Sequence, residues 1–319
     1  MSGELLLFPP SASTAATHLD RLMLALTLLM STVIIIVGAL LVVFCIRYRR
    51  GARAPRANAP SRSRRIELIW STGPLLVFLG IYAWAAHDFL ELARVPADAM
   101  PVFVVAKQWM WKLEHANGRR EISELHVPVG RPVRLTMTSQ DVIHSFYVPA
   151  FRIKQDVVPG RYTTLWFEAT QTGEYDLFCA EYCGTQHSLM RGRIVVMSPA
   201  DFAAWLDRGT QQPSMAQRGF ALFRSYGCDG CHGANSSVHA PKLDGVAGRT
   251  VALADGRNIT ADDTYLRDSI LLPARDVVAG YAPIMPSYAG QIDEADLMAI
   301  IRYLHEGAAA QGDEDEQRH

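Results

Sequence analysis

The 319-residue sequence has almost no excess of charge, because 31 Lys and Arg oppose 32 Asp and Glu, for a formal net charge of -1. Such a balance gives no indication of nucleic acid as a partner. The sequence also lacks a glycine-rich phosphate loop and a Ser/His/Asp arrangement. It therefore offers no sign of a nucleotide site or of a hydrolase with an activated nucleophile.

Charged residues are absent from residues 22–46, and a second uncharged run covers residues 68–86. A helix needs roughly 20 apolar residues to cross a bilayer, so both runs predict transmembrane helices, at about residues 20–46 and 67–88. Pro74 lies in the second run, where neighbouring helices and adjacent Ser or Thr side chains satisfy the freed carbonyl. The alternative is a pair of buried core helices in a soluble protein.

Acidic residues are absent between the two runs, where the segment RYRRGARAPRANAPSRSRR holds eight arginines: Arg47, Arg49, Arg50, Arg53, Arg56, Arg62, Arg64 and Arg65. The positive-inside rule predicts that this loop is cytoplasmic and that both chain ends lie on the periplasmic or outer side. Its position between two spans explains the arginines better than DNA binding does. No basic residue lies near Met1, so we expect a retained helix rather than a cleaved signal peptide.

Helical patterns are missing from residues 101–197, where short β-rich runs alternate with Gly and Pro. This pattern predicts an antiparallel sandwich or barrel, in a domain of residues 96–200 that follows an N-terminal membrane segment of residues 1–95. Ser198, Pro199 and Asp201 predict the start of a short helix that stops at Gly209. Residues 201–214 are then a helix and a linker, the linker being residues 210–214.

A helical pattern returns in residues 215–308. Apolar residues at helical spacing mark one face of a helix that begins near Asp293; they are Leu297, Ile300, Ile301 and Leu304. The acidic residues 309–319 are expected to form a frayed tail.

The densest group of reactive side chains is the segment CAEYCGTQHSLM, which holds Cys179, Cys183, His187 and Met190, with His144 upstream in QDVIHSFYVP. Thiolate, imidazole and thioether together suit copper better than zinc, which rarely binds Met. One copper needs one Cys, so the second thiolate indicates two bridged copper ions with Met190 as a weak outer ligand. A disulfide leaves the other three residues unexplained. A zinc site of two Cys and two His leaves Met190 without a role.

A second motif, CDGCH, is the attachment signature of c-type haem, in which Cys228 and Cys231 bond the vinyl groups and His232 becomes an axial ligand. A thioredoxin-like reading needs a βαβ context that is missing, and a bare disulfide or a metal knuckle remains as an alternative. Met285, in the proline-bounded segment YAPIMPSYAG, is the predicted sixth ligand. Met298 is the rival, but it lies in the amphipathic C-terminal helix, where Met more often fills a core.

These motifs resemble a known family. DVIHSFYVP followed by CAEYCGTQHSLMRGRIVV is similar to the copper A motif of cytochrome c oxidase subunit II. The resemblance implies a two-helix transmembrane hairpin and a cupredoxin-like antiparallel β-sandwich. Residues 215–306 resemble a small, all-α class I cytochrome c.

The resemblance also implies the roles of individual residues. It implies that the copper A ligands are the side chains of His144, Cys179, Cys183, His187 and Met190 and the backbone carbonyl of Glu181. It further implies that the carboxylate of Glu181 reaches a magnesium ion at the interface with the catalytic subunit.

Two further roles are implied by shorter motifs. QWMW resembles the aromatic patch through which electrons enter, which makes Trp109 the first residue of that path, although a position commonly Tyr in the family is Met110 here. On pattern alone, Trp109 and Trp111 alternate along a strand and are equally consistent with core aromatics. IELIW matches a motif whose glutamate lies at the mouth of a proton pathway, the role of Glu67 by analogy. A solvated flanking charge is the alternative.

As a whole, the sequence resembles subunit II of the bacterial inner-membrane haem-copper oxidases that carry their own cytochrome c domain. The resemblance implies electron transfer from a cytochrome c or another donor, through haem c and copper A, to subunit I, which reduces oxygen and pumps protons. Subunit III and membrane lipid are further expected partners, and nucleic acid is not one. The alternatives are a tethered electron carrier for another reductase, such as a nitrous oxide or nitric oxide reductase, or a copper chaperone, which would need no covalent haem.

Overall fold

The computed structural model describes residues 9–53, 63–208, 213–233 and 236–307. The chain divides into two compact units. One unit is the pair of long helices within Thr14–Val95, and the other comprises Met1–Ser13 together with Pro96–His319.

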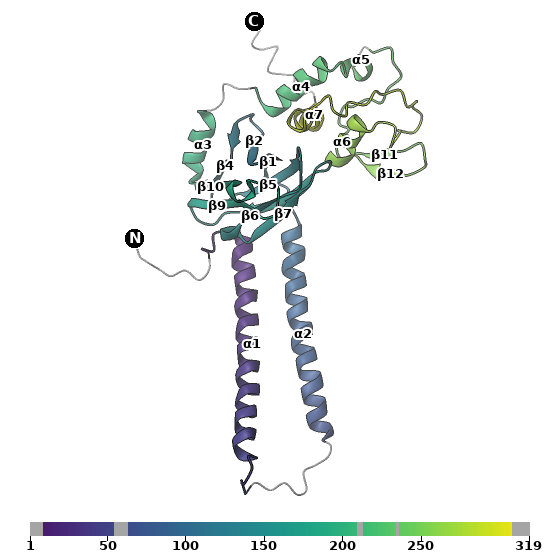
Figure 1. The fold of residues 1–319 in the computed structure, drawn as a ribbon. Helices are drawn as coiled ribbons and strands as arrows, with labels where there is room; N and C mark the ends of the chain where they lie inside the picture. Colours follow the sequence, from purple (N-terminus) through teal and green to yellow (C-terminus); the bar gives the residue numbers. More distant parts are fainter. Residues whose placement is uncertain (1–8, 54–62, 209–212, 234–235, 308–319) are drawn as a thin grey trace. The chain divides into compact units, whose positions relative to one another are not determined.

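The helical unit consists of α1 (Thr14–Arg47) and α2 (Arg64–Ala93), both long and apolar enough to cross a membrane (Figure 1). Their most apolar stretches are not buried, which contradicts the alternative of core helices in a soluble protein. Both helices are longer than predicted, because the flanking Ala, Leu, Arg and Glu residues favour helix, and the charged ones among them can continue a helix outside the lipid. Pro74 lies inside an unbroken α2. Arg56 and Arg62 of the arginine segment lie outside the described residues.

Ten strands form the sandwich, in two five-stranded sheets. The first sheet has the order β3-β2-β1-β5-β8, with β1 (Met100–Lys107), β2 (Met110–His115), β3 (Arg120–Ile122), β5 (Pro132–Ser139) and β8 (Thr163–Glu168). The second has the order β4-β10-β9-β6-β7, with β4 (Glu124–Pro128), β6 (His144–Val148), β7 (Ile153–Val157), β9 (Gly173–Cys179) and β10 (Arg191–Met197). Short 3-10 turns, η1 (Pro149–Phe151) and η2 (His187–Leu189), lie in two of the connections.

The sheets are mixed rather than purely antiparallel as predicted. β1 pairs in parallel with β5, and β4 pairs in parallel with β10, whereas the other pairs are antiparallel. The reason is the path of the chain, which crosses to the second sheet at β4 and returns at β5, so β5 is not joined to β1 by a hairpin. Alternating strand residues still fill the space between the sheets, with Trp111, Phe146 and Phe167 fully buried, and Phe151 of η1 is fully buried beside them.

Residues before α1 also contribute to the sandwich. Ser13 forms an isolated antiparallel bridge with Ala169, and its hydroxyl donates to the carbonyl of Phe151 at 2.9 Å. After β10 comes α3 (Pro199–Asp207), whose first amides are capped by the hydroxyl of Ser198. This confirms the predicted helix start. Gly209 and the linker up to residue 212 lie outside the described residues.

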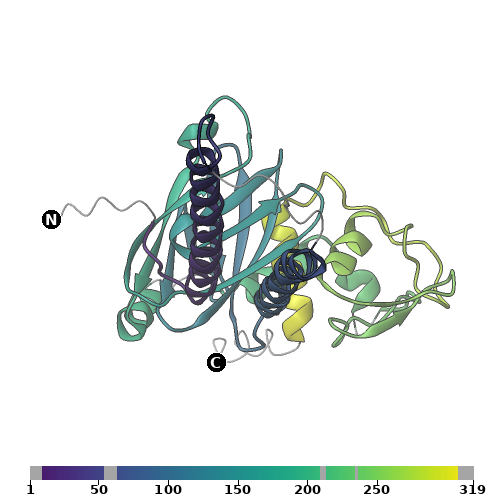
Figure 2. The ribbon, with the colours of Figure 1, turned by 90° about the horizontal axis from the view of Figure 1, so that it is seen from below.

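The C-terminal domain contains four helices among the described residues, α4 (Met215–Ser225), α5 (Asp229–His232), α6 (Asp263–Leu271) and α7 (Glu294–Glu306), and a short ribbon of β11 (Thr250–Ala252) and β12 (Asn258–Thr260). These elements group together in Figures 1 and 2. Asp293 caps α7 as predicted, and Ser214 caps α4 rather than lying in a linker. The predicted tail, residues 309–319, lies outside the described residues.

The backbones of helices α4 and α7 approach each other closely at Gly219. A Cβ atom at this position would lie 1.9 Å from the carbonyl oxygen of Ala299, so no larger residue fits without separating the helices.

The C-terminal domain also packs against the sandwich within the same compact unit. Phe103 and Val105 of β1 form one apolar cluster with Met215, Met298 and Ala299 of α4 and α7. At its border the guanidinium of Arg218 donates to the carboxylate of Glu114 at 2.7 Å, and both side chains are largely buried. The two domains therefore share this small apolar cluster.

Candidate copper and haem sites

Five side chains predicted to bind copper converge where β6 begins and β9 ends. His144 is the first residue of β6 and Cys179 is the last residue of β9. These strands are paired, with Phe146 opposite Cys179, which brings the two ligands together from distant parts of the sequence. Cys183 lies in the following loop. His187 begins η2, and Met190 directly precedes β10.

The distances within this group fit two metal ions sharing two sulfur atoms. The Sγ atoms of Cys179 and Cys183 are 3.8 Å apart, and both cysteines are free. A disulfide has its sulfurs about 2.05 Å apart, so the structure contains no such bond here. The Nδ1 atom of His144 lies 3.9 Å from Cys179 Sγ. The Nδ1 of His187 and the Sδ of Met190 lie 3.4 and 3.7 Å from Cys183 Sγ.

The backbone of Glu181 also faces the site, with its carbonyl oxygen 3.2 Å from Cys179 Sγ. Each cysteine sulfur therefore has one imidazole and one weaker donor nearby. His144, Cys179, Cys183 and Met190 are buried, which keeps water from the sulfurs. Soft donors in a dry pocket are the environment in which protein-bound copper exchanges electrons.

Asp141 orients the buried imidazole of His144. Its carboxylate lies 2.8 Å from Nε2, which leaves Nδ1 turned toward Cys179. The same carboxylate accepts from the backbone N–H of Gln108 at 2.7 Å. Such outer partners fix the tautomer and direction of a metal-binding histidine. Asp141 was not predicted from the sequence, although it lies only three residues before His144.

The two cysteines have different acidities in the metal-free chain. Burial opposes ionisation of Cys179, but hydrogen bonds from His144 and from nearby backbone groups lower its pKa to about 6. Burial, together with the neighbouring sulfur of Cys179, raises the pKa of Cys183 to about 12. At neutral pH the pair therefore holds one thiolate and one thiol, and binding metal at both sulfurs releases a proton.

Trp109 lies in the turn between β1 and β2 rather than on a strand. Its indole N–H donates to the carbonyl of Cys183 at 3.3 Å, and the side chain of Gln108 donates to the same oxygen at 2.9 Å. Gly184 permits this approach, because a Cβ there would lie 2.9 Å from Gln108 Nε2. Trp111, by contrast, is fully buried in β2. The interpretation as a core aromatic is therefore right for Trp111 and wrong for Trp109.

Glu67 lies in the first turn of α2 and is exposed. This first turn is the end of α2 that directly follows the arginine-rich segment. Its role in proton uptake stays a prediction.

The four residues predicted to hold haem line one cavity of about 1010 Å³ in the C-terminal domain: Cys228, Cys231, His232 and Met285. The carbonyl of Pro241 lies 2.8 Å from the Nδ1 of His232, which fixes the ring and leaves Nε2 for a metal. Valine, leucine and isoleucine side chains make up much of the remaining wall. A large apolar cavity with two thiols and an oriented imidazole fits a covalent haem.

The cavity also separates the two candidate axial methionines. Met285 is half-buried on the cavity wall. Met298 is buried in the cluster with Phe103 and Val105, where the C-terminal domain meets the sandwich. Its side chain therefore fills a core, as a helical Met commonly does.

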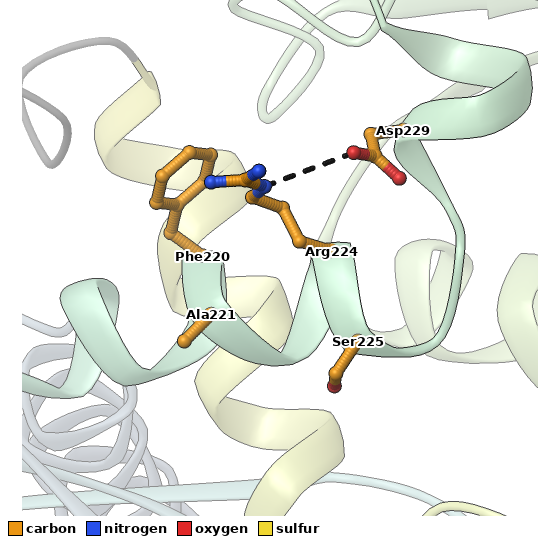
Figure 3. A pocket seen from close by; sticks show the side chains of 5 residues that line it. All are labelled: Phe220, Ala221, Arg224, Ser225 and Asp229. Atoms are coloured by element: carbon orange, nitrogen blue, oxygen red, sulfur yellow. Dashed lines mark ion pairs between the residues drawn. The ribbon is translucent and has the colours of Figure 1, made fainter.

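A second hollow, of about 390 Å³, opens on the surface of α4 (Figure 3). Arg224 lies 5.9 Å above the ring of Phe220 and 3.8 Å from a carboxylate oxygen of Asp229. None of the predicted ligands is among its described lining residues, so we assign it no cofactor.

One group of side chains was overlooked in the sequence. His115 and His126 have no ligand motif around them, but the structure brings them to Glu121 and Glu124. The signal was weak, because the residues come from three short strands whose pairing is a tertiary property.

Known protein families match three successive parts of the chain. The transmembrane domain of cytochrome c oxidase subunit II matches residues 2–85, the periplasmic domain of the same subunit matches residues 121–198, and cytochrome c matches residues 216–308. The chain is 30% identical to cytochrome c oxidase subunit 2 of Thermostichus vulcanus over 253 residues, which cover 62% of this chain and 77% of the relative. The chain belongs to the cytochrome c oxidase subunit II family.

Two other subunits of this family show how far the similarity extends. The alternative cytochrome c oxidase subunit 2 of Bradyrhizobium diazoefficiens is 36% identical over 160 residues, and the match spans 40% of this chain and 56% of that protein. Cytochrome c oxidase subunit 2 of Alkalihalophilus pseudofirmus is 26% identical over 315 residues, which span 92% of this chain and 88% of the relative. The subunit II and cytochrome c matches imply copper A and haem c as cofactors, in agreement with the two sites described above.

Proposed function

We propose that this chain is the subunit through which electrons enter a bacterial haem-copper oxidase. It accepts electrons from a cytochrome c or another donor at its C-terminal domain and passes them through its copper domain to subunit I. The observation that carries the proposal is the convergence of His144, Cys179, Cys183, His187 and Met190 around two sulfurs 3.8 Å apart. Oxygen reduction and proton pumping belong to subunit I.

Each residue has a distinct part in this proposal. The copper A ligands are the five side chains and the Glu181 carbonyl, and the haem ligands are Cys228, Cys231, His232 and Met285. The copper ions and the haem supply one-electron redox chemistry when they are bound. The chain's own contribution is to hold imidazoles and sulfurs in fixed directions and to exclude water.

Further roles rest on the family resemblance. Trp109 is proposed as the residue at which electrons reach the copper site, which its hydrogen bond to the Cys183 carbonyl supports. The carboxylate of Glu181 is proposed to reach a magnesium ion shared with subunit I, and Glu67 to stand at a proton pathway. Subunit III and membrane lipid are proposed neighbours.

The proposed location is the bacterial inner membrane. The two apolar helices support two spans, and the arginines that end α1 and begin α2 support a cytoplasmic loop. The copper and haem domains then lie on the periplasmic side, where haem attachment takes place in such families. Domain boundaries at residues 95, 200 and 214 are proposed on the same basis.

The replacement Cys183→Ser tests the proposal in the full-length chain. We expect loss of the dinuclear copper signal in paramagnetic resonance and of most bound copper, with the c-type haem spectrum unchanged. Cys45→Ser is the matched control, because Cys45 is exposed on α1 and far from both sites in sequence. A resonance from a lone copper in the unmodified chain would contradict the assignment. Purification with a partner that lacks haem-copper chemistry would favour the carrier for a different reductase.

A further inference from the structure

The segment that carries Met285 has no regular structure of its own. Residues 282–290 form no helix or strand, and within them Met285 and Tyr288 are partly buried while the other residues are exposed. Both side chains line the cavity of about 1010 Å³ that the four predicted haem residues also line. The direction of Met285 therefore depends on the contacts that hold this segment in place.

One set of contacts joins the segment to the end of α6. The hydroxyl of Ser287 donates to the carbonyl of Leu271 at 2.6 Å, and the backbone N–H of Tyr288 donates to the carbonyl of Ile270 at 3.2 Å. Both acceptors lie in the last turn of α6, and Ile270 itself lines the cavity. These contacts fix the segment against one wall of the cavity.

A second contact reaches the segment that leads into the CDGCH motif. The hydroxyl of Tyr288 donates to the carbonyl of Tyr226 at 3.1 Å, two residues before Cys228. Tyr226 is the C-cap of α4, where helix carbonyls lack an intrahelical partner, and the tyrosine hydroxyl supplies one. The two tyrosine rings lie edge to face, with centroids 6.2 Å apart and planes at 79°, a favourable arrangement for an aromatic pair.

A short turn links the Tyr226 carbonyl to the predicted haem attachment. Gly227 has a φ of +73°, a conformation that glycine adopts without strain, and Cys228 then precedes α5 as its N-cap. The last residue of α5 is His232. The hydroxyl of Tyr288 therefore attaches the segment of the predicted sixth ligand to the element that carries the predicted fifth ligand.

We propose that Tyr288 is a positioning residue, which holds Met285 in place as a haem ligand by tying its segment to the haem-attachment motif. The role rests on the haem ligation proposed above. A thioether is a weak ligand, and an external ligand can displace it. Every contact that exists only while Met285 is bound raises the fraction of molecules in that state, and the Tyr288 hydroxyl makes such a contact.

The test is Tyr288→Phe in the full chain in detergent, with copper and haem bound. This change keeps the ring and removes only the hydroxyl. Imidazole binds the oxidised haem once Met285 has left, so loss of a hydrogen bond from the Met-bound state should raise the apparent imidazole affinity by about 5-fold. A spectroscopic titration of the haem measures this. The midpoint potential of the haem should also fall, because His/Met ligation raises it.

A matched variant and a double variant make the result specific. Tyr226→Phe keeps both rings and the acceptor carbonyl, and loses a hydroxyl that lies 3.5 Å from the Gln291 carbonyl. So long a bond is weak, and imidazole affinity should stay within about 2-fold. In a Met285→Ala background, Tyr288→Phe should have little further effect, because there is no thioether left to hold.

Two results would overturn the role of Tyr288. One is an imidazole affinity and a midpoint potential in Tyr288→Phe equal to those of the unmodified chain. The other is an equal effect of Tyr288→Phe with and without Met285, which would show a general loosening of the domain. A chain without covalent haem, or a haem spectrum unchanged by Met285→Ala, would instead contradict the proposed ligation itself, and the role of Tyr288 with it.

Discussion

At the scale of single residues, the sequence motifs predict which side chains bind metal, and the fold adds the groups that orient them. The candidate ligands within CAEYCGTQHSLM and CDGCH could be predicted because their spacing is local, whereas His144 and Met285 lie outside these two segments. Asp141 and Gln108 could not be assigned, since their roles depend on a turn of the first sheet meeting a loop of the second. The hydrogen bond of Trp109 to the Cys183 carbonyl depends on the same contact between the two sheets.

Asp141→Asn tests the aiming of His144. An amide can no longer act as a charged acceptor for Nε2, so we expect copper affinity to fall by about 10- to 100-fold, as for other outer partners of metal-bound histidines. Competition with a copper chelator measures this, and the haem spectrum should not change. Asp176→Asn, on the exposed side of β9, is the control and should retain copper. Equal copper retention by both variants would remove Asp141 from the site.

The pH dependence of thiol alkylation tests the acidities of the cysteine pair in the copper-free chain. The thiolate is the reactive form, so modification of Cys179 should rise as the pH increases through about 6. Cys183 should stay unmodified to far higher pH, because its pKa is raised to about 12. Mass spectrometry of peptides from chain treated at each pH gives both curves.

Replacement of one cysteine provides the check on this difference. In Cys179→Ser the neighbouring negative charge is lost, so the pKa of Cys183 should fall and its alkylation should begin at lower pH. An unchanged curve for Cys183 would show that burial alone sets its acidity.

At the scale of helices and strands, the starts of helices were predicted correctly from the sequence, whereas the pairing of strands between distant segments was not. Ser198 and Asp293 were correctly predicted to begin helices because a cap is a property of neighbouring residues. The parallel pairing of β1 with β5 escaped prediction, because it depends on which sheet receives β4. The membrane helices were predicted too short, since hydropathy marks the part in lipid and not the end of the helix.

Gly219→Ala tests the packing of α4 on α7. The added Cβ would lie 1.9 Å from the Ala299 carbonyl, so the helices must separate, and we expect a loss of about 1–3 kcal/mol in the stability of the C-terminal domain. Thermal unfolding followed through haem absorbance measures it. Ala221→Val adds bulk on the exposed side of the same helix and should cost about 0.5 kcal/mol. A Gly219→Ala protein as stable as this control would contradict the packing.

At the scale of the whole molecule, the separate domains were predicted from the sequence, but the contact between the sandwich and the C-terminal domain was not. The cluster of Phe103, Val105, Met215 and Met298 has no motif, because its members belong to elements that are each regular on their own. Met298 shows the consequence, since a residue that is a candidate haem ligand by type proves to be a contact between domains.

Arg218→Gln tests this joining. The change leaves the largely buried Glu114 without its partner from the C-terminal domain, which we expect to cost about 1–3 kcal/mol. Burial already raises the pKa of Glu114, and loss of Arg218 removes the strongest opposing influence, so the carboxyl should take up a proton at higher pH. Calorimetric unfolding should separate into two transitions.

Arg120→Gln is the control for that experiment. Arg120 also pairs with Glu114, at 3.3 Å, but it belongs to the sandwich and is half exposed. Its replacement should leave the unfolding of the two domains coincident. Identical behaviour of the two variants would show that the ion pair does not hold the domains together.

The pairing of β6 with β9 has a consequence for the order of biogenesis. Among the candidate side-chain ligands, His144 is the one that depends on this pairing to reach the cysteine loop. The other four follow one another between the end of β9 and the start of β10. If the site binds copper as proposed, the sandwich is expected to close before the chain reaches full affinity for the metal. A chain in which β6 has not yet paired with β9 is therefore expected to lack His144 as a ligand.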